Sequence, residues 1–473
     1  MKKVNISIVS ILFVMLGVLS SCSIDNIAIN ESALHKQTPQ ISFSDSEYKL
    51  LGTLSRPNSI GLSEAKECIA GYIGFHNTRI DDASLQEIGI LTKGLLGTIP
   101  DSVSMMLPDT LAYVFYSEND ERYIVASADN RVSTPILAFM SNGNLLDQNE
   151  SLEKCQIIEM LRDYIYLEIR DYESNRESLL QEILDKINNG RAFTRAKDDP
   201  EYSEDDLIVI DYEFGGWYLT DYVDQLLRVA WSQEAPYNDK VKNKENCGTV
   251  KTGCVATAVA QICSFWKYPK TIENITLNWD NLTAQSRIYA HETNKVNQVS
   301  TLMKVIGEGS GMNYGCSESH TDAYEGRNWL NTIGYSGGDE YSYDYDKVVL
   351  SLKAGCPVLA RGERVSNGGG RKGHTWVIDG YAVNERKRRR QVFLRDNKTG
   401  QQVVLSDNVY TEKDKSLDIN WGWGGNFNGW FPEGCFDAYS LLRRKTITRS
   451  NDDDNRNYEY TRKIFVGLKP SSI

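Results

Sequence analysis

The pattern of apolar and polar positions predicts short strands followed by long helices in the first half of the chain. Residues 112–116 and 123–127 are short apolar runs on either side of a polar turn, which predicts two paired strands. Residues 135–139 form a third apolar run that ends before an Asn-Gly turn. Over 152–187 apolar residues recur at helical spacing among many charges, which predicts long amphipathic helices.

A polar stretch separates this half from the rest. Residues 189–206 have little apolar content, and exposed polar loops are where proteolytic nicking concentrates, so this stretch is the expected linker or processing region. From 207 onward aromatic residues, glycines and short apolar strands dominate. We therefore expect one folded domain over 46–188 and a second over 207–473.

The N-terminus has the pattern of an export signal. Two lysines precede an apolar run over 6–19, which is shorter than the ~20 residues that span a bilayer. The run ends in Leu-Ser-Ser-Cys, which resembles a bacterial lipobox and implies that Cys22 is lipidated. We expect a signal peptide over 1–21, a tether over 22–45, and a protein lipid-anchored to a bacterial outer membrane or cell surface, from which processing could release it. An uncut membrane anchor is the alternative.

Composition and charge allow a large core and argue against some partners. Hydrophobic residues make up 41% of the chain and charged residues 25%. The net charge of −12 argues against nucleic acid as a partner. The basic run over 386–390 lies between strand-like segments, so we interpret it as a solvated hairpin or loop rather than a polyanion site.

The cysteines do not indicate a metal site. Nine cysteines show neither a dense disulfide framework nor a Cys-x-x-Cys pair, so a structural zinc site has little support. Cys316 and His320 could share a helix face, but no second ligand pair accompanies them. We expect no metal and no cofactor.

Cys254 is the candidate nucleophile. It follows Gly253, which suits a tight turn, and precedes a run over 255–262 whose many small residues suit a closely packed helix. This predicts a cysteine at a helix N-terminus, where unpaired amides and the helix dipole favour a thiolate and lower the thiol pKa. An inert buried cysteine is the alternative.

His374 is the candidate base among the five histidines. It follows a glycine-rich stretch over 368–373 and begins an apolar strand over 374–380, so a substrate backbone could approach it closely. It lies 120 residues after Cys254, comparable to the Cys-to-His separation in papain-like enzymes. The alternative is a surface histidine beside a mobile loop.

Two further segments could complete such a site. A Cys-His pair needs a group that orients the imidazole, and Asn420 could serve, with Trp421 shielding the pair from water. Gln233 could donate a hydrogen bond to a developing oxyanion alongside the Cys254 amide. An aromatic-rich core hairpin and a polar turn before a proline are the respective alternatives.

The motifs around these residues together resemble the streptopain family of papain-like bacterial cysteine peptidases. Three segments look like the family's signatures: 253–258 (GCVATA), 373–380 (GHTWVIDG) and 420–425 (NWGWGG). Gln233 resembles the family's oxyanion glutamine. The resemblance covers about 231–467 and implies a papain-like α+β fold with Cys254 on a helical side and His374 on a β-rich side.

The N-terminal half resembles a second known element. Residues 124–129 and 135–139 look like the propeptide of streptopain-like zymogens, which folds over the active site and blocks it. The resemblance implies that 46–188 is a smaller α+β inhibitory propeptide domain and that the chain is a cysteine endopeptidase made as a zymogen. The implied partners are protein or peptide substrates and the chain's own propeptide, with the membrane contacted only through the lipid anchor.

The sequence departs from the family pattern in two places. Residues 316–322 replace a stretch that is usually rich in Ser, Gly and Ala, so the substrate pocket, to which we assign Gly373 and Ser319, is expected to be unusual. Residues 382–417 are longer than in streptopain itself, which predicts an extended hairpin. In the family the residue at the position of Trp421 shares the orienting role, so its division with Asn420 is open.

Two other functions stay open. The same Cys-His chemistry serves amidases and acyltransferases that act on small substrates, and release of fragments from casein, lost in Cys254→Ala, would exclude them. A lipid-anchored binding protein without turnover is the non-enzymatic alternative, which a thiol-directed epoxide probe would distinguish.

Overall fold

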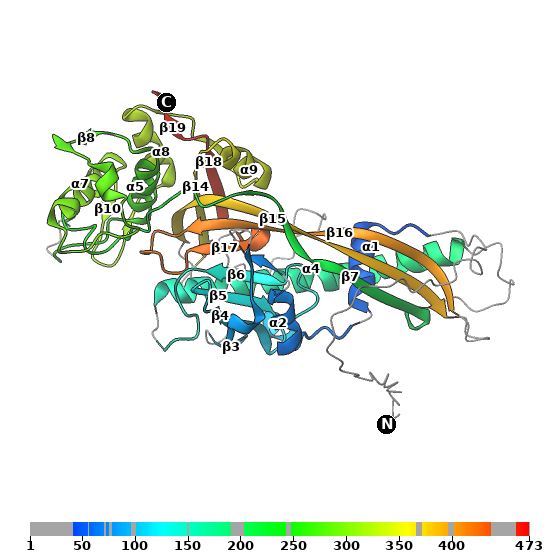
Figure 1. Ribbon diagram of the computed structural model, residues 1–473. Coiled ribbons are helices and arrows are strands. Elements are labelled where there is room, and N and C mark those ends of the chain that lie inside the picture. The colour runs from blue at the N-terminus through cyan, green and yellow to red at the C-terminus, as the bar shows by residue number, and fades with distance from the viewer. Residues whose placement is uncertain are drawn as a thin grey trace, which may run out of the picture.

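One antiparallel sheet connects the two halves of the chain in the computed structural model (Figure 1). The structure describes residues 41–54, 56–70, 72–74, 78–95, 101–148, 151–190, 203–242, 247–365, 371–395, 402–436 and 460–472. The expected signal peptide, Cys22, most of the tether and most of the linker lie outside these residues. Within them, no helix combines the length and the apolarity needed to cross a membrane.

The sheet has the order β13-β18-β14-β15-β16-β17-β6-β5-β4-β3, and β7 also pairs with β15. Its strands are β3 (Leu85–Thr92), β4 (Thr110–Ser117), β5 (Arg122–Ser127), β6 (Ile136–Met140), β7 (Leu207–Val223), β13 (Asp339–Ser342), β14 (Val358–Val365), β15 (Arg371–Arg395), β16 (Gln402–Asn420), β17 (Gly429–Pro432) and β18 (Tyr460–Val466). The halves meet where β17 pairs with β6, with Trp430 opposite Phe139. The N-terminal strands therefore extend the sheet that carries the later ones.

Short two-stranded ladders lie outside this sheet. They are formed by β1 (Ile73–Gly74) with β2 (Thr78–Arg79), β8 (Thr271–Ile272) with β9 (Ile275–Thr276), β10 (Asn313–Tyr314) with β11 (Ser319–His320), and β12 (Tyr335–Ser336) with β19 (Lys469–Pro470). The helices are α1 (Asp45–Leu54), α2 (Leu62–Ala70), α3 (Asp101–Met106), α4 (Leu152–Gly190), α5 (Cys254–Trp266), α6 (Trp279–Leu282), α7 (Thr293–Gly309), α8 (Ala323–Thr332) and α9 (Tyr345–Lys353). The predicted α+β class is confirmed.

The N-terminal elements follow the sequence pattern closely. The strands predicted over 112–116, 123–127 and 135–139 are β4, β5 and β6. The region over 152–187 forms one helix, α4, rather than several. It is uninterrupted because it contains no proline, and its only glycine is the final residue, Gly190.

The C-terminal elements place helices on one side and the sheet on the other, as expected for a papain-like arrangement. Helices α5, α7 and α8 form the helical side at the left of Figure 1, and α5 packs against β15. Nearly all of α5 is buried, which its many small residues permit. The hydrophobic core beneath α4 joins residues of both halves, for example Ile165 with Ile378 and Phe431.

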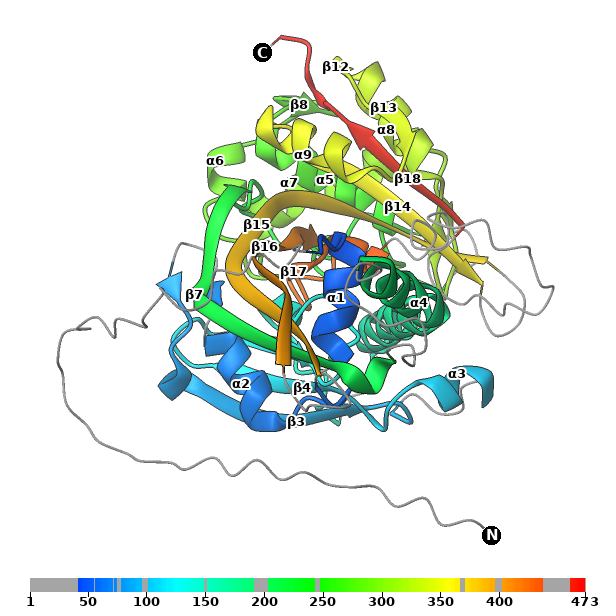
Figure 2. The same ribbon diagram turned by 90° about the vertical axis from the view of Figure 1, so that its right-hand side faces the viewer.

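A long extension, which we call the arm, projects from the sheet. It consists of residues 207–223 (β7) with the outer parts of β15 and β16, 382–395 and 402–417, and it lies at the right of Figure 1. The extended hairpin predicted over 382–417 is confirmed. Figure 2 shows the arm curving beside α1 and α4, and a hydrophobic cluster joins Leu50, Ile183 and Val392.

The basic run over 386–390 lies in the predicted hairpin, but it is not solvated as expected. The run lies in the middle of β15, where it pairs with both β16 and β7. Arg386, Arg388 and Arg390 are buried, with 8%, 6% and 4% exposure, whereas Lys387 between them is exposed. The alternation of a strand turns every second side chain toward the N-terminal half, which covers it.

Candidate functional site

Gly253 starts helix α5 with Cys254 as its first residue. Gly253 has φ 87°, a left-handed conformation that favours glycine. A Cβ at this position would come within 2.6 Å of the Met312 side chain. The backbone can therefore turn into the helix here only without a side chain, and Cys254 lies at the helix N-terminus, as predicted.

His374 lies on β15, opposite Gly362 of β14. The strand begins three residues before His374, at Arg371, because the ladder with β14 continues that far. The imidazole Nε2 lies 2.9 Å from the backbone carbonyl oxygen of Trp421. A carbonyl only accepts a hydrogen bond, so Nε2 carries the proton and Nδ1 is the nitrogen that can accept one.

Aromatic rings enclose the imidazole. The ring of Trp423 stacks on it with a centroid distance of 4.9 Å, and the ring of Trp421 lies 6.1 Å away. Only 7% of His374 is exposed. The shielding that the sequence assigned to Trp421 is therefore provided more closely by Trp423, a residue that the sequence analysis did not single out.

A single cavity of about 470 Å³ brings most of the candidate residues together. The predicted residues that line it are Gln233, Cys254, Ser319, Gly373 and His374. The backbone of Gln233 is fixed because its carbonyl oxygen accepts a hydrogen bond of 2.9 Å from the Thr252 amide, two residues before Cys254. Elements distant in sequence thus converge on one space.

The side chain of Asn420 is engaged away from the imidazole. Its Nδ2 donates to the Val229 carbonyl oxygen at 2.7 Å, and its Oδ1 accepts from the Gly422 amide at 3.2 Å. Asn420 is fully buried. The Asn420 side chain thus joins its strand to the backbone at Val229 and Gly422, and the Trp421 carbonyl lies against His374 Nε2. The orienting role assigned to Asn420 stays a prediction.

The pKa of the Cys254 thiol reflects opposing influences. Burial raises this pKa above its ordinary value, and this effect is the largest. Hydrogen bonds from the backbone and side chain of Thr375, and from the backbone of Val255 and of Cys254 itself, lower it by less. The lowered pKa expected from the helix N-terminus is therefore outweighed by burial in this structure.

Thr375 is a residue of the site that sequence reasoning missed. It follows His374 directly, is 4% exposed and lines the same cavity. Its contact with the sulfur depends on how β15 packs against α5. Its position next to the candidate base was the one signal in the sequence.

The N-terminal half closes one side of the cavity. Leu152, Glu153 and Gln156, from the first turns of α4, line it together with Cys254 and His374. An adjoining cavity of about 510 Å³ is lined by Glu153 together with Gln233 and Trp423. The start of α4 is therefore positioned where a substrate would reach the cysteine.

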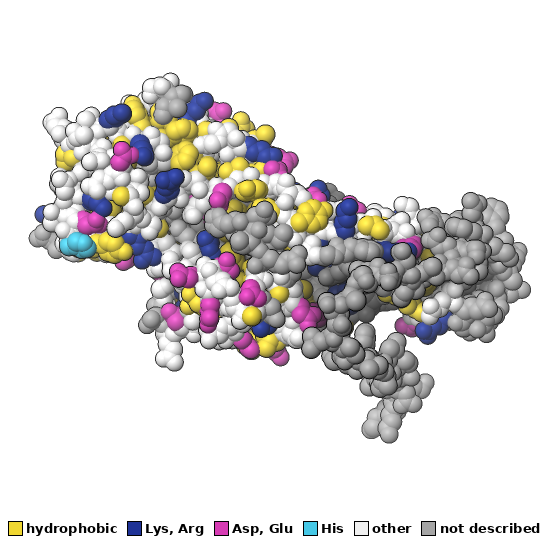
Figure 3. All heavy atoms as spheres, in the orientation of Figure 1, with side chains coloured by type: hydrophobic (Ala, Val, Ile, Leu, Met, Phe, Trp, Pro, Cys, Tyr) yellow, Lys and Arg dark blue, Asp and Glu magenta, His cyan; other side chains and the backbone are white. Residues whose placement is uncertain are grey.

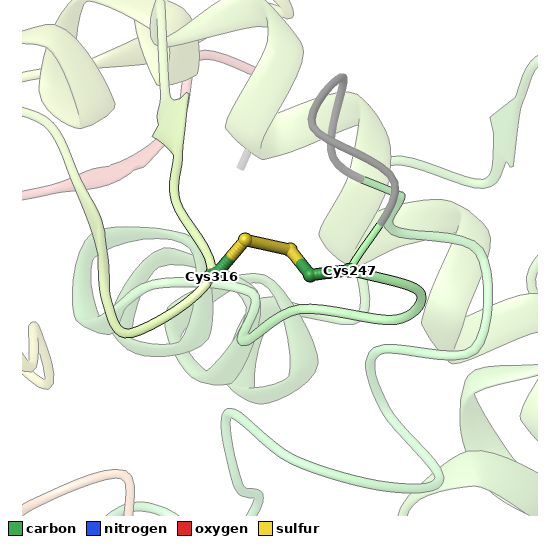
Figure 4. The surroundings of a disulfide bond; sticks show 2 residues. All are labelled: Cys247 and Cys316. Carbon is green, nitrogen blue, oxygen red and sulfur yellow. A yellow bond between two sulfur atoms is a disulfide. The ribbon is translucent and has the colours of Figure 1, made fainter.

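A disulfide fixes another wall of the cavity (Figure 4). Cys247, which precedes α5, is bonded to Cys316, and the next residues, 317–319, line the cavity. Cys316 is thus engaged in a covalent bond and is not available as a metal ligand. Among the described residues, no group of three or more His, Cys, Asp or Glu side chains is placed to hold a metal ion.

Charged side chains also line the cavity. Arg361 of β14 forms an ion pair with Asp322, the N-cap residue of α8, across the cavity wall. Glu318 and Lys251 lie on the same lining.

Over the face seen in Figure 3, acidic side chains gather over the N-terminal strands, consistent with the net charge of −12.

Comparison with known proteins gives matches in one class. Residues 231–431 match the Peptidase C10 family. A thiol protease/hemagglutinin, PrtT, of Porphyromonas gingivalis is 22% identical over 272 residues, which cover 52% of this chain and 26% of that protein. The chain thus spans about a quarter of the length of this curated relative.

Two solved structures from Prevotella intermedia are also similar. A fragment of prointerpain A, solved as a mutant, is 20% identical and has a TM-score of 0.43, with 76% of this chain and 96% of that chain covered. Active interpain A, a cysteine protease, is 22% identical with a TM-score of 0.34, covering 52% of this chain and 94% of that one.

Proposed function

We propose that the chain, whose residues 231–431 match the Peptidase C10 family, is a cysteine endopeptidase made as an inhibited zymogen. In this proposal Cys254 is the nucleophile and His374 is the base. The observation that supports this assignment is the shared cavity, which is lined by the first residue of α5 and by an imidazole that the Trp421 carbonyl orients. Neither residue type is unusual alone, but this pairing is what thiol activation requires.

The proposed mechanism uses the residues that line the cavity. His374 takes the proton of the Cys254 thiol at Nδ1, and the thiolate attacks the carbonyl carbon of a peptide bond. The Cys254 amide and the Gln233 side chain donate hydrogen bonds to the oxyanion. His374 then gives its proton to the leaving amine, and water hydrolyses the thioester and restores the thiol.

The N-terminal half is proposed to be the inhibitor. The first turns of α4 line the cavity beside Cys254 and His374, and in this proposal they compete with a peptide substrate for that space. Burial there also keeps the Cys254 thiol protonated, as the raised pKa indicates. Export and lipidation at Cys22 complete the proposal, supported by the N-terminal sequence.

Fragment release from casein tests the peptidase proposal. Processed wild-type protein should release fragments, and Cys254→Ala should reduce the rate by at least about a thousandfold, since the nucleophile is lost. Cys263→Ala, in the same helix but buried in the core, is the matched control and should keep most of the activity if its circular dichroism matches the wild type. Undiminished release by Cys254→Ala would refute the assignment of the nucleophile.

Incorporation of labelled palmitate tests the anchor separately. In bacterial cells that express the full chain, the wild type should take up the label and Cys22→Ala should not. Cys68→Ala retains the proposed acceptor and is the control. Equal labelling of the wild type and Cys22→Ala would exclude lipidation at this position.

A further inference from the structure

The arm presents one continuous face to the N-terminal half. Seven alternate residues of β15 are buried: Ala382, Asn384, Arg386, Arg388, Arg390, Val392 and Leu394. The residues between them are partly or fully exposed, from Val383 to Arg395. A strand with such alternation has one face covered along its whole length.

Helix α1 and the end of α4 cover the outer part of this face. Leu50 and Leu51 of α1 and Ile183 of α4 cluster with Val392 and Leu394 of β15. At Gly52 of α1 the packing leaves no room for a side chain, because a Cβ there would come within 2.3 Å of the Arg390 guanidinium.

Polar contacts add to this cover. The Tyr48 hydroxyl is hydrogen-bonded to Ser406 Oγ at 2.9 Å, and the Tyr48 ring stacks on Tyr410 with a centroid distance of 5.9 Å. The Ile41 amide donates to the Leu405 carbonyl oxygen at 3.0 Å. Apolar and polar contacts of α1 therefore both end on the arm.

A buried carboxyl group binds the N-terminal half nearer the base of the arm. Asp414 of β16 accepts hydrogen bonds from the Tyr72 hydroxyl at 2.7 Å and from Thr134 Oγ1 at 2.8 Å. Asn384 Nδ2 donates to the same Tyr72 hydroxyl at 2.9 Å. These contacts lie on strands of the arm that are separate from the Cys254 cavity.

The centre of the covered face is charged, which distinguishes it from a permanent core. Arg386 Nε donates to Glu412 at 2.6 Å and its guanidinium lies over Trp217, 4.4 Å from the ring centre. Arg390 donates to the Tyr410 hydroxyl at 2.6 Å. Because these partners all belong to the arm, the face keeps its charge pairs when its cover is removed, as separable interfaces do.

We propose that the arm is a docking surface for residues 41–190, so that cutting the chain within 191–202 leaves the N-terminal segment bound as a separate polypeptide. The partner is recognised by an apolar helix pair, α1 with the end of α4, and by hydroxyl groups that meet Asp414 and Ser406. The segment then continues to block the Cys254 cavity after the cut, and activity follows its departure. This inference rests on the proposed zymogen function.

Cutting by an added protease tests the docking without relying on the chain's own activity. The protein is the full chain with Cys254→Ala, with the recognition sequence of an unrelated endoprotease placed within 191–202 and an affinity tag at the C-terminus. After complete cutting, the N-terminal fragment should remain with the tagged part through affinity capture and gel filtration. Immediate separation of the two fragments would overturn the proposal, whatever the outcome of the casein assay.

Variants then test whether the arm is responsible. Leu51→Ala on α1 and Leu405→Ala on the arm should each release the fragment at least ten times faster than the parent, while Ser46→Ala, on the exposed side of α1, should match the parent. If an uncut leucine variant does not keep the circular dichroism of the parent, Tyr48→Phe decides, because it removes only the hydroxyl bonded to Ser406 and should still accelerate release severalfold. Release of the folded arm variants at the control rate would refute the proposal.

Discussion

At the scale of single residues, the site combines groups that raise and lower the reactivity of one sulfur. Burial raises the pKa of the Cys254 thiol, and donors from Thr375, Val255 and Cys254 itself lower it. The start of α4 contributes to the burial because it lines the same cavity. The net result in this structure is a thiol whose pKa lies above its ordinary value.

Thr375→Val is predicted to raise the pKa of the Cys254 thiol further. The substitution removes a hydroxyl that donates to the sulfur and keeps the side-chain shape, so less thiolate is present at a given pH. The midpoint of the pH profile for iodoacetamide labelling of Cys254, followed by peptide mass spectrometry, should rise by about half to one pH unit.

Thr375→Ser is the matched control for this shift. It keeps the hydroxyl and should return the labelling midpoint to the wild-type value. A role in packing alone would change stability in both variants without moving the midpoint. An unchanged midpoint in Thr375→Val would contradict the assigned contact.

Asn420→Ala is predicted to act on stability more than on the orientation of His374. The Val229 carbonyl and the Gly422 amide would lose their buried partner, at a cost of about 1–3 kcal/mol in the free energy of unfolding. The Trp421 carbonyl would still orient the imidazole. Urea unfolding should show this loss, while the folded, processed variant keeps the wild-type pH profile of kcat/KM; a shifted profile at unchanged stability would support direct orientation by Asn420.

At the scale of elements, β15 connects the base to the arm. His374 lies near its start, and two nearly fully buried carboxyl groups, Asp379 and Asp418, lie where β15 and β16 leave the cavity region. Asp379 occupies an irregularity in the ladder, and its Oδ2 accepts a hydrogen bond of 3.0 Å from the Leu227 amide. Burial raises the pKa of both groups, and that of Asp418 to about 7.

The raised pKa of Asp418 predicts a stability that falls as pH rises. The folded protein holds the proton more tightly than the unfolded chain, whose Asp pKa is about 3.9. The contribution of protonated Asp418 to the free energy of unfolding is complete below about pH 4. It is lost as the pH rises toward about 7, by up to about 1.4 kcal/mol per pH unit. Asp418→Asn cannot ionise, so its urea unfolding free energy should depend less on pH between 4 and 7 than that of the wild type; parallel curves would contradict the assignment.

Local patterns predicted the elements that carry the site, and long-range packing decided the rest. Small residues after Cys254 and the apolar run after His374 were sufficient for α5 and β15. Burial of Arg390 could not be predicted because α1, which packs against it at Gly52, lies more than 330 residues away in the chain. The orienting group at His374 is a backbone carbonyl, and side-chain identity carries no signal for such an atom.

The pairing of cysteines shows the same limit. Cys247 and Cys316 are 69 residues apart, and their bond requires the approach of two loops, with a Cα–Cα distance of 5.9 Å, that only the packed helices provide. Similarly, the sequence of β6 carried no signal for its second partner β17, with which it pairs at two positions. The division into two domains by sequence therefore did not anticipate a common sheet.

At the scale of the whole molecule, α4 separates the cavity from the linker. Its first residue, Leu152, lines the Cys254 cavity, and its last, Gly190, lies at the other end of one helix of 39 residues. At about 1.5 Å per residue the helix is about 58 Å long. The chain resumes before β7, whose Leu207 pairs with Leu394 near the tip of the arm, so both ends of the linker lie far from Cys254.

This distance predicts that the linker is cut by a second molecule of the enzyme. The twelve residues 191–202 span at most about 42 Å when fully extended, and they must start and finish at the arm, so they cannot reach the cysteine of their own chain. The initial rate of trimming within 188–210, measured by mass spectrometry, should rise with the square of the precursor concentration. The fraction trimmed per unit time should therefore double when the concentration doubles.

The Cys254→Ala variant alone should stay intact, yet it should be trimmed in the same region when processed wild type is added. Trimming whose fractional rate is independent of concentration would require an intramolecular cut, and therefore a rearrangement that carries α4 away from the arm before the linker is cleaved.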